Sequence, residues 1–155
     1  MKLCVFSDSH GISDNMLHAI YVEDPDAIIF LGDGERDLNP IRRRCPNLAV
    51  HAVCGNCDTG FSVPDKLILT LEGVRIFAVH GHRHDVKYDR SLDYLFRSAR
   101  HENANVIVFG HTHVPYMETR EEVLLLNPGA CGFFQPHYAR LYLESGSAWA
   151  ELADL

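Results

Sequence analysis

Polar residues that can bind metal ions follow a series of short apolar segments in this chain. The donors are Asp8, His10, Asp33, Asn56, His80, His111 and His113. Each follows a segment of the length and apolar character of a buried β-strand. In open α/β sheets the carboxyl ends of parallel strands meet at the edge where ligands bind. We therefore expect these seven side chains to form one cluster, although they lie far apart in the sequence.

The donor types in this predicted cluster are two carboxylates, one amide and four imidazoles. Imidazole and carboxylate together suit Mn, Fe, Co, Ni or Zn better than Ca or Mg. Seven donors exceed the needs of one tetrahedral ion, whereas two ions sharing a carboxylate would use them and leave positions for water and substrate. Such two-metal sites, with ions roughly 3.5–4 Å apart, occur in phosphatases and nucleases.

The charges of such a site point to a phosphoester. Two divalent ions carry four positive charges, of which Asp8 and Asp33 would neutralise two. A phosphodiester monoanion and a hydroxide would neutralise the rest, although Asp37, Asp58 and Asp85 could change this sum.

The elements that must position the donors are predicted from the apolar pattern. Strands are expected at 2–7, 27–31, 48–53, 66–72, 74–79, 106–109, 138–144 and 147–152, with two more within 117–126. Helices are expected from Ser13 to Val22, from Asp37 to the three arginines at 42–44, and over 89–101. Ser13 and Asp37 are residue types that cap helices. The order begins as βαβαβ and becomes strand-rich, which favours an α/β fold with parallel and antiparallel strands and helices outside.

Length and composition narrow the class of protein. A chain of 155 residues suits one compact domain, so we predict a single domain over 1–155. No apolar run approaches the ~20 residues of a membrane helix, and the N-terminal run is too short for a signal-peptide core. A cytoplasmic location is therefore expected, with reduced thiols at the five cysteines. The net charge of −7 weighs against a nucleic-acid partner, while a homo-oligomer stays possible.

The motifs resemble the calcineurin-like metallophosphoesterase superfamily, whose signature is D-x-H, G-D-x-x-D, G-N-H-[D/E], a later H and G-H-x-H. The matching segments are Asp8-Ser9-His10, Gly32-Asp33 with Asp37, Gly55-Asn56-Cys57-Asp58, His80-Gly81-His82 and Gly110-His111-Thr112-His113. Asp37 lies one residue later than the family pattern. The small size and the Cys57 variant resemble the short bacterial and archaeal phosphodiesterase branch.

This resemblance implies a four-layer sandwich of two mixed β-sheets flanked by helices. It implies a hydrolase, a phosphodiesterase in which metal-bound hydroxide attacks a small phosphoester. Asp8, His10 and His113 would bind the first ion, and Asn56, His80 and His111 the second. Asp33 would bridge both ions. Manganese is the first choice of metal, with Fe, Ni, Co or Zn as alternatives.

Cys57 departs from the pattern because many relatives have a histidine there, proposed to protonate the leaving group. A thiol, with a reference pKa of about 8.5, is a weaker acid and donor than an imidazolium near neutral pH. We therefore expect slow hydrolysis of esters with alkoxide leaving groups. Metal ligation by the thiol is a competing role. Cys54-x-x-Cys57 could also be half a zinc ribbon or a redox pair, but no second CxxC exists.

Two other functions compete with the phosphodiesterase. A non-catalytic metal-binding scaffold of the same fold is one, because the retromer subunit with this fold is a non-enzymatic relative. A scaffold can lose metal donors, whereas all seven expected positions hold usable donors here. A nuclease is the other, and the acidic charge disfavours it. His82 and His84 could line the substrate cleft or be solvated loop residues.

Overall fold

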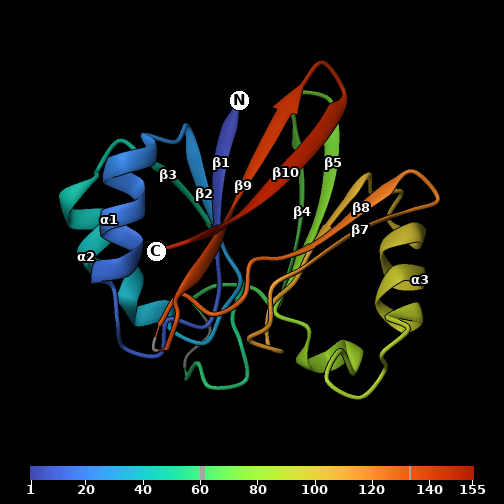
Figure 1. Cartoon of the computed structure of the whole chain (residues 1–155), viewed down its shortest axis with the longest axis horizontal. Coiled ribbons are helices and arrows are strands. Elements are labelled where there is room, and N and C mark those ends of the chain that lie inside the picture. Colours follow the sequence, from blue (N-terminus) through green and yellow to red (C-terminus); the bar gives the residue numbers. More distant parts are fainter. Residues whose placement is uncertain (60–61, 133) are drawn as a thin grey trace.

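The computed structural model describes residues 1–59, 62–132 and 134–155, in which two mixed five-stranded sheets pack face to face (Figure 1). The first sheet has the order β10 (Ser147–Asp154), β9 (His137–Glu144), β1 (Lys2–Phe6), β2 (Ala27–Phe30), β3 (Ala49–Ala52). The second has the order β4 (Lys66–Leu71), β5 (Val74–Val79), β6 (Val106–Val108), β8 (Val123–Asn127), β7 (Tyr116–Arg120). Residues 60–61 and 133 lie outside the described part.

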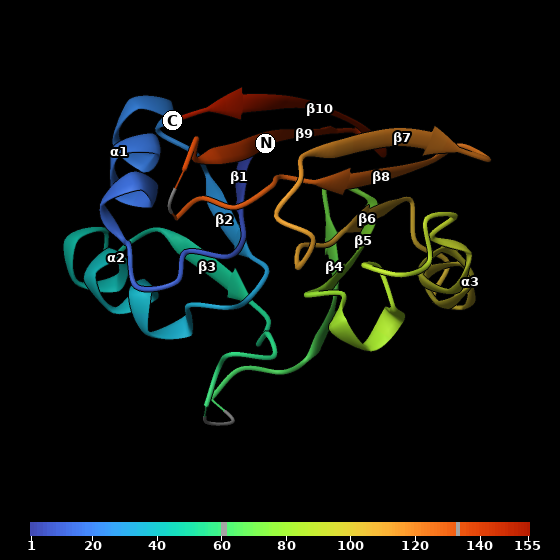
Figure 2. The same ribbon diagram turned by 60° about the horizontal axis from the view of Figure 1, so that its bottom comes forward.

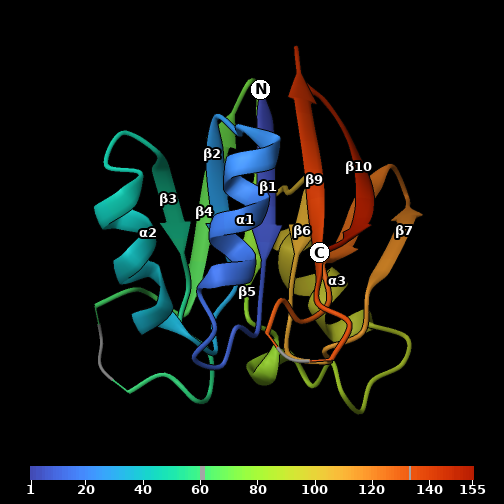
Figure 3. The same cartoon turned by 60° about the vertical axis from the view of Figure 1, so that its left-hand side comes forward.

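The helices cover the outer faces of the two sheets, which confirms the predicted four-layer α/β sandwich. They are α1 (Asp14–Glu23), α2 (Leu38–Arg44) and α3 (Asp93–His101), with short 3-10 helices η1 (Glu35–Asp37) and η2 (His82–His84). Figure 3 shows α1 and α2 over the first sheet, while α3 lies beside the second sheet in Figure 1. No helix in the described ranges is both long and apolar enough to cross a membrane.

Three apolar layers explain why the central strands are apolar throughout. Val5 and Ile76 belong to the core between the sheets. Phe30 packs with Met16 of α1 on the outer face of the first sheet, and Leu95 of α3 lies in the corresponding core of the second sheet. Strands that are covered on both faces gain from apolar residues at every position.

The strand directions decide where the donors gather. In the first sheet β1, β2 and β3 are parallel, and in the second β5, β6 and β8 are parallel. The loops that follow β1, β2, β3, β5 and β6 lie together at the end of the sandwich drawn at the bottom of Figure 1. Figure 2 turns this end toward the viewer. The carboxyl ends of strands from both sheets therefore form the place where the donors are predicted to gather.

Two predicted helix caps differ in the structure. α1 does begin after Ser13, but the Ser13 side chain makes no capping hydrogen bond. α2 begins after Asp37, whose carboxylate Oδ2 instead accepts hydrogen bonds from Ser9 Oγ at 2.6 Å and from the Gly11 N–H at 2.8 Å. Asp37 therefore joins its own loop to the loop after β1, a long-range contact that local pattern cannot reveal.

The helix predicted over 89–101 is shorter than expected and begins at Asp93. Asp89 accepts hydrogen bonds from the Ser91 N–H at 3.0 Å and from Ser91 Oγ at 2.5 Å. Leu92 then adopts a left-handed conformation with φ +55°. Because a residue with positive φ cannot continue an α-helix, the first turn of the predicted helix becomes a loop.

Candidate metal centre

The seven predicted donors all lie at the loop end of the sandwich. Asp8 and His10 follow β1, Asp33 follows β2, Asn56 follows β3, His80 follows β5, and His111 and His113 follow β6. Within this end, the structure divides the histidine and carboxylate donors into a group around Asp8 and a group around His80.

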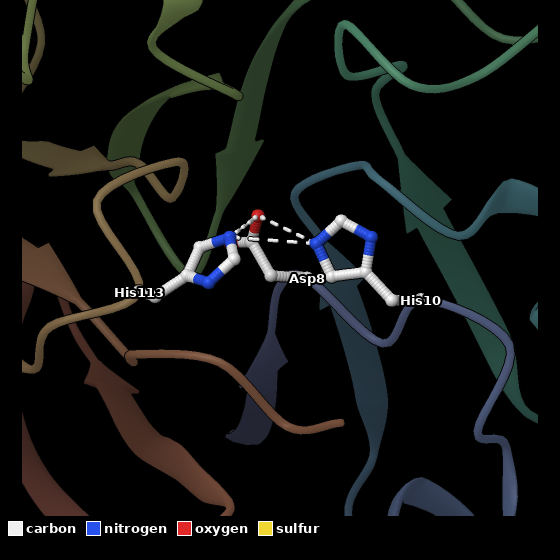
Figure 4. A group of neighbouring side chains, drawn as sticks. All are labelled: Asp8, His10 and His113. Carbon is white, nitrogen blue, oxygen red and sulfur yellow. Dashed lines mark hydrogen bonds and ion pairs between the residues drawn. The ribbon is translucent and has the colours of Figure 1, made fainter. Parts of the chain in front are cut away.

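The first group consists of Asp8, His10 and His113 (Figure 4). Asp8 Oδ1 lies 3.1 Å from His113 Nε2 and 3.8 Å from His10 Nε2, and the two imidazole nitrogens are 3.4 Å apart. The rings approach from opposite sides in Figure 4 and aim their nitrogens at the same carboxylate oxygen. Three donor atoms thus surround one point at distances suited to a shared ion.

The two oxygens of the Asp8 carboxylate have different surroundings. Oδ2 accepts hydrogen bonds from Ser7 Oγ at 2.5 Å and from the His111 N–H at 3.1 Å. Oδ1 is buried and has no hydrogen-bond partner within the described residues. A buried carboxylate oxygen without a partner is costly. A metal ion between Asp8, His10 and His113 would satisfy it, so this donor set fits a bound cation.

The second group is organised by His80, whose side chain is fully buried. Its Nδ1 lies 2.7 Å from the carbonyl oxygen of Leu31, which can only accept, so Nδ1 carries the proton. The Nε2 atom then faces Asn56 Oδ1 at 3.2 Å, His111 Nδ1 at 3.1 Å and Asp33 Oδ2 at 3.4 Å. With His80 neutral, its Nε2 lone pair faces an amide oxygen, a carboxylate oxygen and a nitrogen of His111, and either a proton on His111 or a cation must lie among these atoms.

The pKa values of the two histidines reflect the same requirement. Burial works to lower the pKa of His80, but the hydrogen bond to Asp33 and the charges of Asp8 and Asp33 outweigh it and raise that pKa. Burial and the charge of His80 lower the pKa of His111 to about 4. One positive charge is therefore favoured between these donors, whether a proton or a metal ion supplies it.

Asp33 lies between the two groups. It forms one donor set with His80 and His111, and another with His10 and Cys57. Its Oδ1 accepts a hydrogen bond from the Cys57 N–H at 2.7 Å. Burial works to raise the pKa of Asp33, but hydrogen bonds from His80 and Cys57 outweigh it and hold the pKa well below the ordinary value. The carboxylate is therefore ionised and within reach of both groups.

Asp58 supports the centre through the backbone. Its carboxylate accepts four backbone hydrogen bonds of 2.7–2.9 Å, from the N–H groups of Asp33, Gly34, Glu35 and Gly55. Burial works to raise the pKa of Asp58, but these four donors outweigh it and lower that pKa. Asp58 therefore clamps the loop after β2 to the loop after β3, and its charge is directed at N–H groups.

Backbone strain is concentrated at the donors. Five of the seven adopt left-handed conformations with φ between 45° and 68°: Asp8, His10, Asp33, His111 and His113. Such conformations are uncommon for residues other than glycine and cost of order 1–3 kcal/mol each in sparsely populated regions. The surrounding fold must hold these loops in place, and strain of this kind clusters at functional sites.

Two of the glycines that the sequence places beside the donors allow close approaches. A Cβ atom at Gly55 would lie 2.1 Å from Asp33 Oδ1, and one at Gly110 would lie 1.9 Å from Ser7 Oγ. Neither position has room for a side chain, because the carboxylates of Asp33 and Asp8 are seated against these backbones. Glycine at these sites is therefore a packing requirement.

Asn127 is a supporting residue whose role only the structure reveals. Its side-chain amide donates hydrogen bonds to the Gly110 carbonyl at 3.1 Å and to Thr112 Oγ1 at 3.0 Å, and its Oδ1 accepts from the Gly129 N–H at 2.9 Å. Asn127 is fully buried. These hydrogen bonds fix the loop that carries His111. In the sequence, Asn127-Pro128-Gly129 directly after a strand is the feature that could indicate this supporting role.

Among the described residues, one cavity is lined by donors of the centre and a second lies near it. The first, of about 310 Å³, is lined by His10, Gly11, Asp33, Gly34, Glu35, Arg36, Asp37, Cys57, Asp58 and Thr59. The second, of about 290 Å³, is lined in part by His82 and His84. The His82 ring lies 5.4 Å from the His80 ring, whereas His84 packs against Phe77 and Tyr94. His82 is thus at the margin of the centre, and His84 packs among aromatic rings.

Comparisons with known proteins show the family of this chain. Residues 1–146 match the family model described as the calcineurin-like phosphoesterase superfamily domain. The chain is 32% identical over 161 residues to the probable metallophosphoesterase YsnB of Bacillus subtilis, covering 99% of this chain and 91% of YsnB. It is 30% identical over 157 residues to the phosphodiesterase YfcE of Escherichia coli, covering 84% of this chain and 79% of YfcE. The family predicted from the motifs is confirmed.

The same fold also occurs in proteins with other names. The crystal structure of Vps29 from Entamoeba histolytica complexed with Zn²⁺ superposes with a TM-score of 0.78 at 21% identity, covering 99% of each chain. At this identity the likeness concerns the fold alone.

Proposed function

This chain belongs to the calcineurin-like phosphoesterase superfamily, and from that premise we propose that it is a phosphodiesterase that works with two divalent metal ions. The observation that carries the proposal is the pair of donor groups joined by Asp33. In the first group a buried oxygen of Asp8 lacks a partner within the described residues, and in the second the Nε2 lone pair of His80 faces Asn56, Asp33 and His111.

The proposed ligands follow these groups. Asp8, His10 and His113 would hold the first ion, Asn56, His80 and His111 would hold the second, and Asp33, which belongs to two donor sets, would serve both. Manganese is the first choice, and Fe, Ni, Co or Zn would also suit imidazole and carboxylate donors. Two such ions, when bound, lower the pKa of a water molecule and neutralise charge on phosphoryl oxygens.

The residues of the chain contribute rigidity and charge. The Leu31 carbonyl keeps the proton of His80 on Nδ1, which leaves Nε2 free as a donor. The clamp made by Asp58 and the amide of Asn127 hold the loops that carry Asp33 and His111. Donors fixed in this way need no reorganisation when charge develops in the transition state, which is the main source of electrostatic catalysis.

The cavity beside Asp33 favours a diester over a monoester. Among the described residues that line it, Glu35, Asp37 and Asp58 carry carboxylates beside the single guanidinium of Arg36. A dianionic monoester meets more repulsion from this wall than a monoanionic diester does. The name of the relative YfcE, a phosphodiesterase, agrees with this preference.

The test is a panel of substrates on protein stripped of metal and then supplied with each ion singly. We expect kcat/KM for bis(para-nitrophenyl) phosphate to exceed that for para-nitrophenyl phosphate with at least one ion, and Asp33→Asn to abolish both activities. A preference for the monoester would contradict the proposed substrate class. Binding of two ions without turnover of any phosphoester would contradict the enzymatic function.

A metal-binding scaffold of the same fold is the second candidate, because the two donor groups could hold ions without turning over a substrate. Metal binding alone therefore does not separate the candidates. Turnover does separate them. A nuclease is disfavoured by the net charge of −7 and by the carboxylates around the cavity.

A further inference from the structure

We propose that Cys57 completes a thiol-containing metal site with His10 and Asp33, and that this site binds soft divalent ions such as Cd²⁺ and Zn²⁺. The site is part of the metal centre on which the proposed function rests, but it requires no hydrolysis. It gives the cysteine that replaces the family's histidine a role in selecting among metals.

The geometry places the sulfur among donors. Ligand atoms of His10, Asp33 and Cys57 all lie within 4.8 Å of one another. Atoms that share one tetrahedral ion, with bonds of about 2.0–2.3 Å, lie roughly 3–4 Å apart. Small side-chain rotations therefore bring the three donors to a single ion.

The backbone holds Cys57 in this position. Its N–H donates to Asp33 Oδ1 at 2.7 Å, which ties the residue to the carboxylate that would share the ion. The side-chain amide of Asn56 donates to Cys57 Sγ at 3.3 Å. The sulfur is thus presented to the ion from a fixed backbone.

An ion from solvent can reach the three donors. Cys57 is exposed, whereas Cys4 and Cys131 are fully buried. His10, Asp33 and Cys57 line the same cavity of about 310 Å³. An ion bound by the sulfur would therefore sit on the side of Asp33 that faces this cavity.

The thiol sulfur should bind some metal ions more strongly than others. When a soft ion binds, the S–H bond breaks, the proton leaves to solvent and a sulfur electron pair forms the bond to the metal, without oxidation or reduction. Thiolate prefers soft and borderline ions, whereas Mn²⁺ prefers oxygen and nitrogen donors. Cd²⁺ and Zn²⁺ therefore gain a ligand that Mn²⁺ leaves protonated.

The test is titration of metal-free protein with Cd²⁺, followed by the ultraviolet charge-transfer band of a cadmium–thiolate bond. We expect the wild-type protein to develop the band and Cys57→Ser to lose it. Cys57→Ser should bind Cd²⁺ at least about tenfold more weakly, while its Mn²⁺ affinity changes less. Cys54→Ser is the matched control, because Cys54 lies in the same loop but lines a different cavity, and it should keep the band.

Several outcomes would overturn the proposal. They are a wild-type protein without the band, a band that persists in Cys57→Ser, and a band that disappears in Cys54→Ser. Thermal unfolding of each metal-free variant checks that it is folded, and Cys57→Ala repeats the measurement should the serine variant unfold. Because none of these readouts measures hydrolysis, an inactive protein that shows the band would refute the proposed phosphodiesterase and leave the thiol site intact.

Discussion

The Nε2 atom of His80 lies 3.1 Å from the Nδ1 atom of His111, and both residues belong to one donor set with Asp33. The carbonyl of Leu31 holds His80 from the other side of its ring, and the loop of His111 is held by the amide of Asn127. The fold therefore keeps the Nε2 lone pair of His80 beside His111, where either a proton or a metal ion can bind it.

Removal of His80 should therefore remove one ion. We expect His80→Ala to bind one divalent ion per chain where the wild-type protein binds two, because the second donor group loses its central nitrogen. Metal content after dialysis and calorimetric titration both measure this number. His101→Ala is the control, since His101 is exposed at the end of α3. Two ions retained by His80→Ala would remove His80 from the ligand set.

Loss of the Asp58 clamp should destabilise the metal-free protein. Asp58→Asn replaces a carboxylate that accepts four backbone hydrogen bonds with an amide whose NH₂ group faces N–H donors. We expect the free energy of unfolding in urea to fall by about 2 kcal/mol or more. Asp85→Asn makes the matched change at an exposed residue and should have little effect. Equal stability of the two variants would show that the clamp contributes nothing.

Histidine at position 57 should widen the range of leaving groups. Burial, a hydrogen bond to Asp33 and nearby carboxylates raise the pKa of the Cys57 thiol, which makes it a poor acid near neutral pH. We expect Cys57→His to raise kcat for a dialkyl phosphodiester at least about tenfold, with a smaller change for bis(para-nitrophenyl) phosphate. The comparison requires equal metal content in both proteins. No increase for the dialkyl ester would show that the thiol does not limit protonation of the leaving group.

The protonation of Glu23 should make the free energy of unfolding depend on pH in the acid range. Its carboxylate accepts hydrogen bonds from Tyr138 Oη at 2.5 Å and from Arg140 Nε at 2.8 Å. Burial works to raise the pKa of Glu23, but these contacts outweigh it and lower that pKa. Since the folded-state pKa lies below the unfolded value, the ionised carboxylate stabilises the protein above the unfolded pKa. That contribution is lost as pH falls through the folded pKa.

The corresponding variant is Glu23→Gln, measured by urea unfolding from neutral to acid pH. We expect it to be less stable than wild type at neutral pH and to lose less stability on acidification, so that the two curves converge. Glu144→Gln, at an exposed strand end, should run parallel to wild type. Parallel curves for Glu23→Gln and wild type would rule out the linkage.

The sequence determined the fold class and the place of the donors because both depend on local pattern. A strand covered on both faces must be apolar at every position, as β2 is from Ala27 to Phe30. The first polar residue after such a strand is then a candidate ligand, as Asp33 is. The site candidates follow from these positions and the family from the resemblance of the motifs to a known signature, in both instances without knowledge of any contact.

Only the tertiary structure decided how the donors are grouped and what their neighbours do. Three contacts depend on the order of strands within the two sheets. His80 meets His111, Asp37 binds the loop after β1, and Asp58 faces four N–H groups. These contacts also depend on left-handed backbone at residues such as Asp33. Hydrogen bonds and lone-pair contacts act over about 3 Å, so they are set by three-dimensional packing, to which residue spacing along the chain gives no guide.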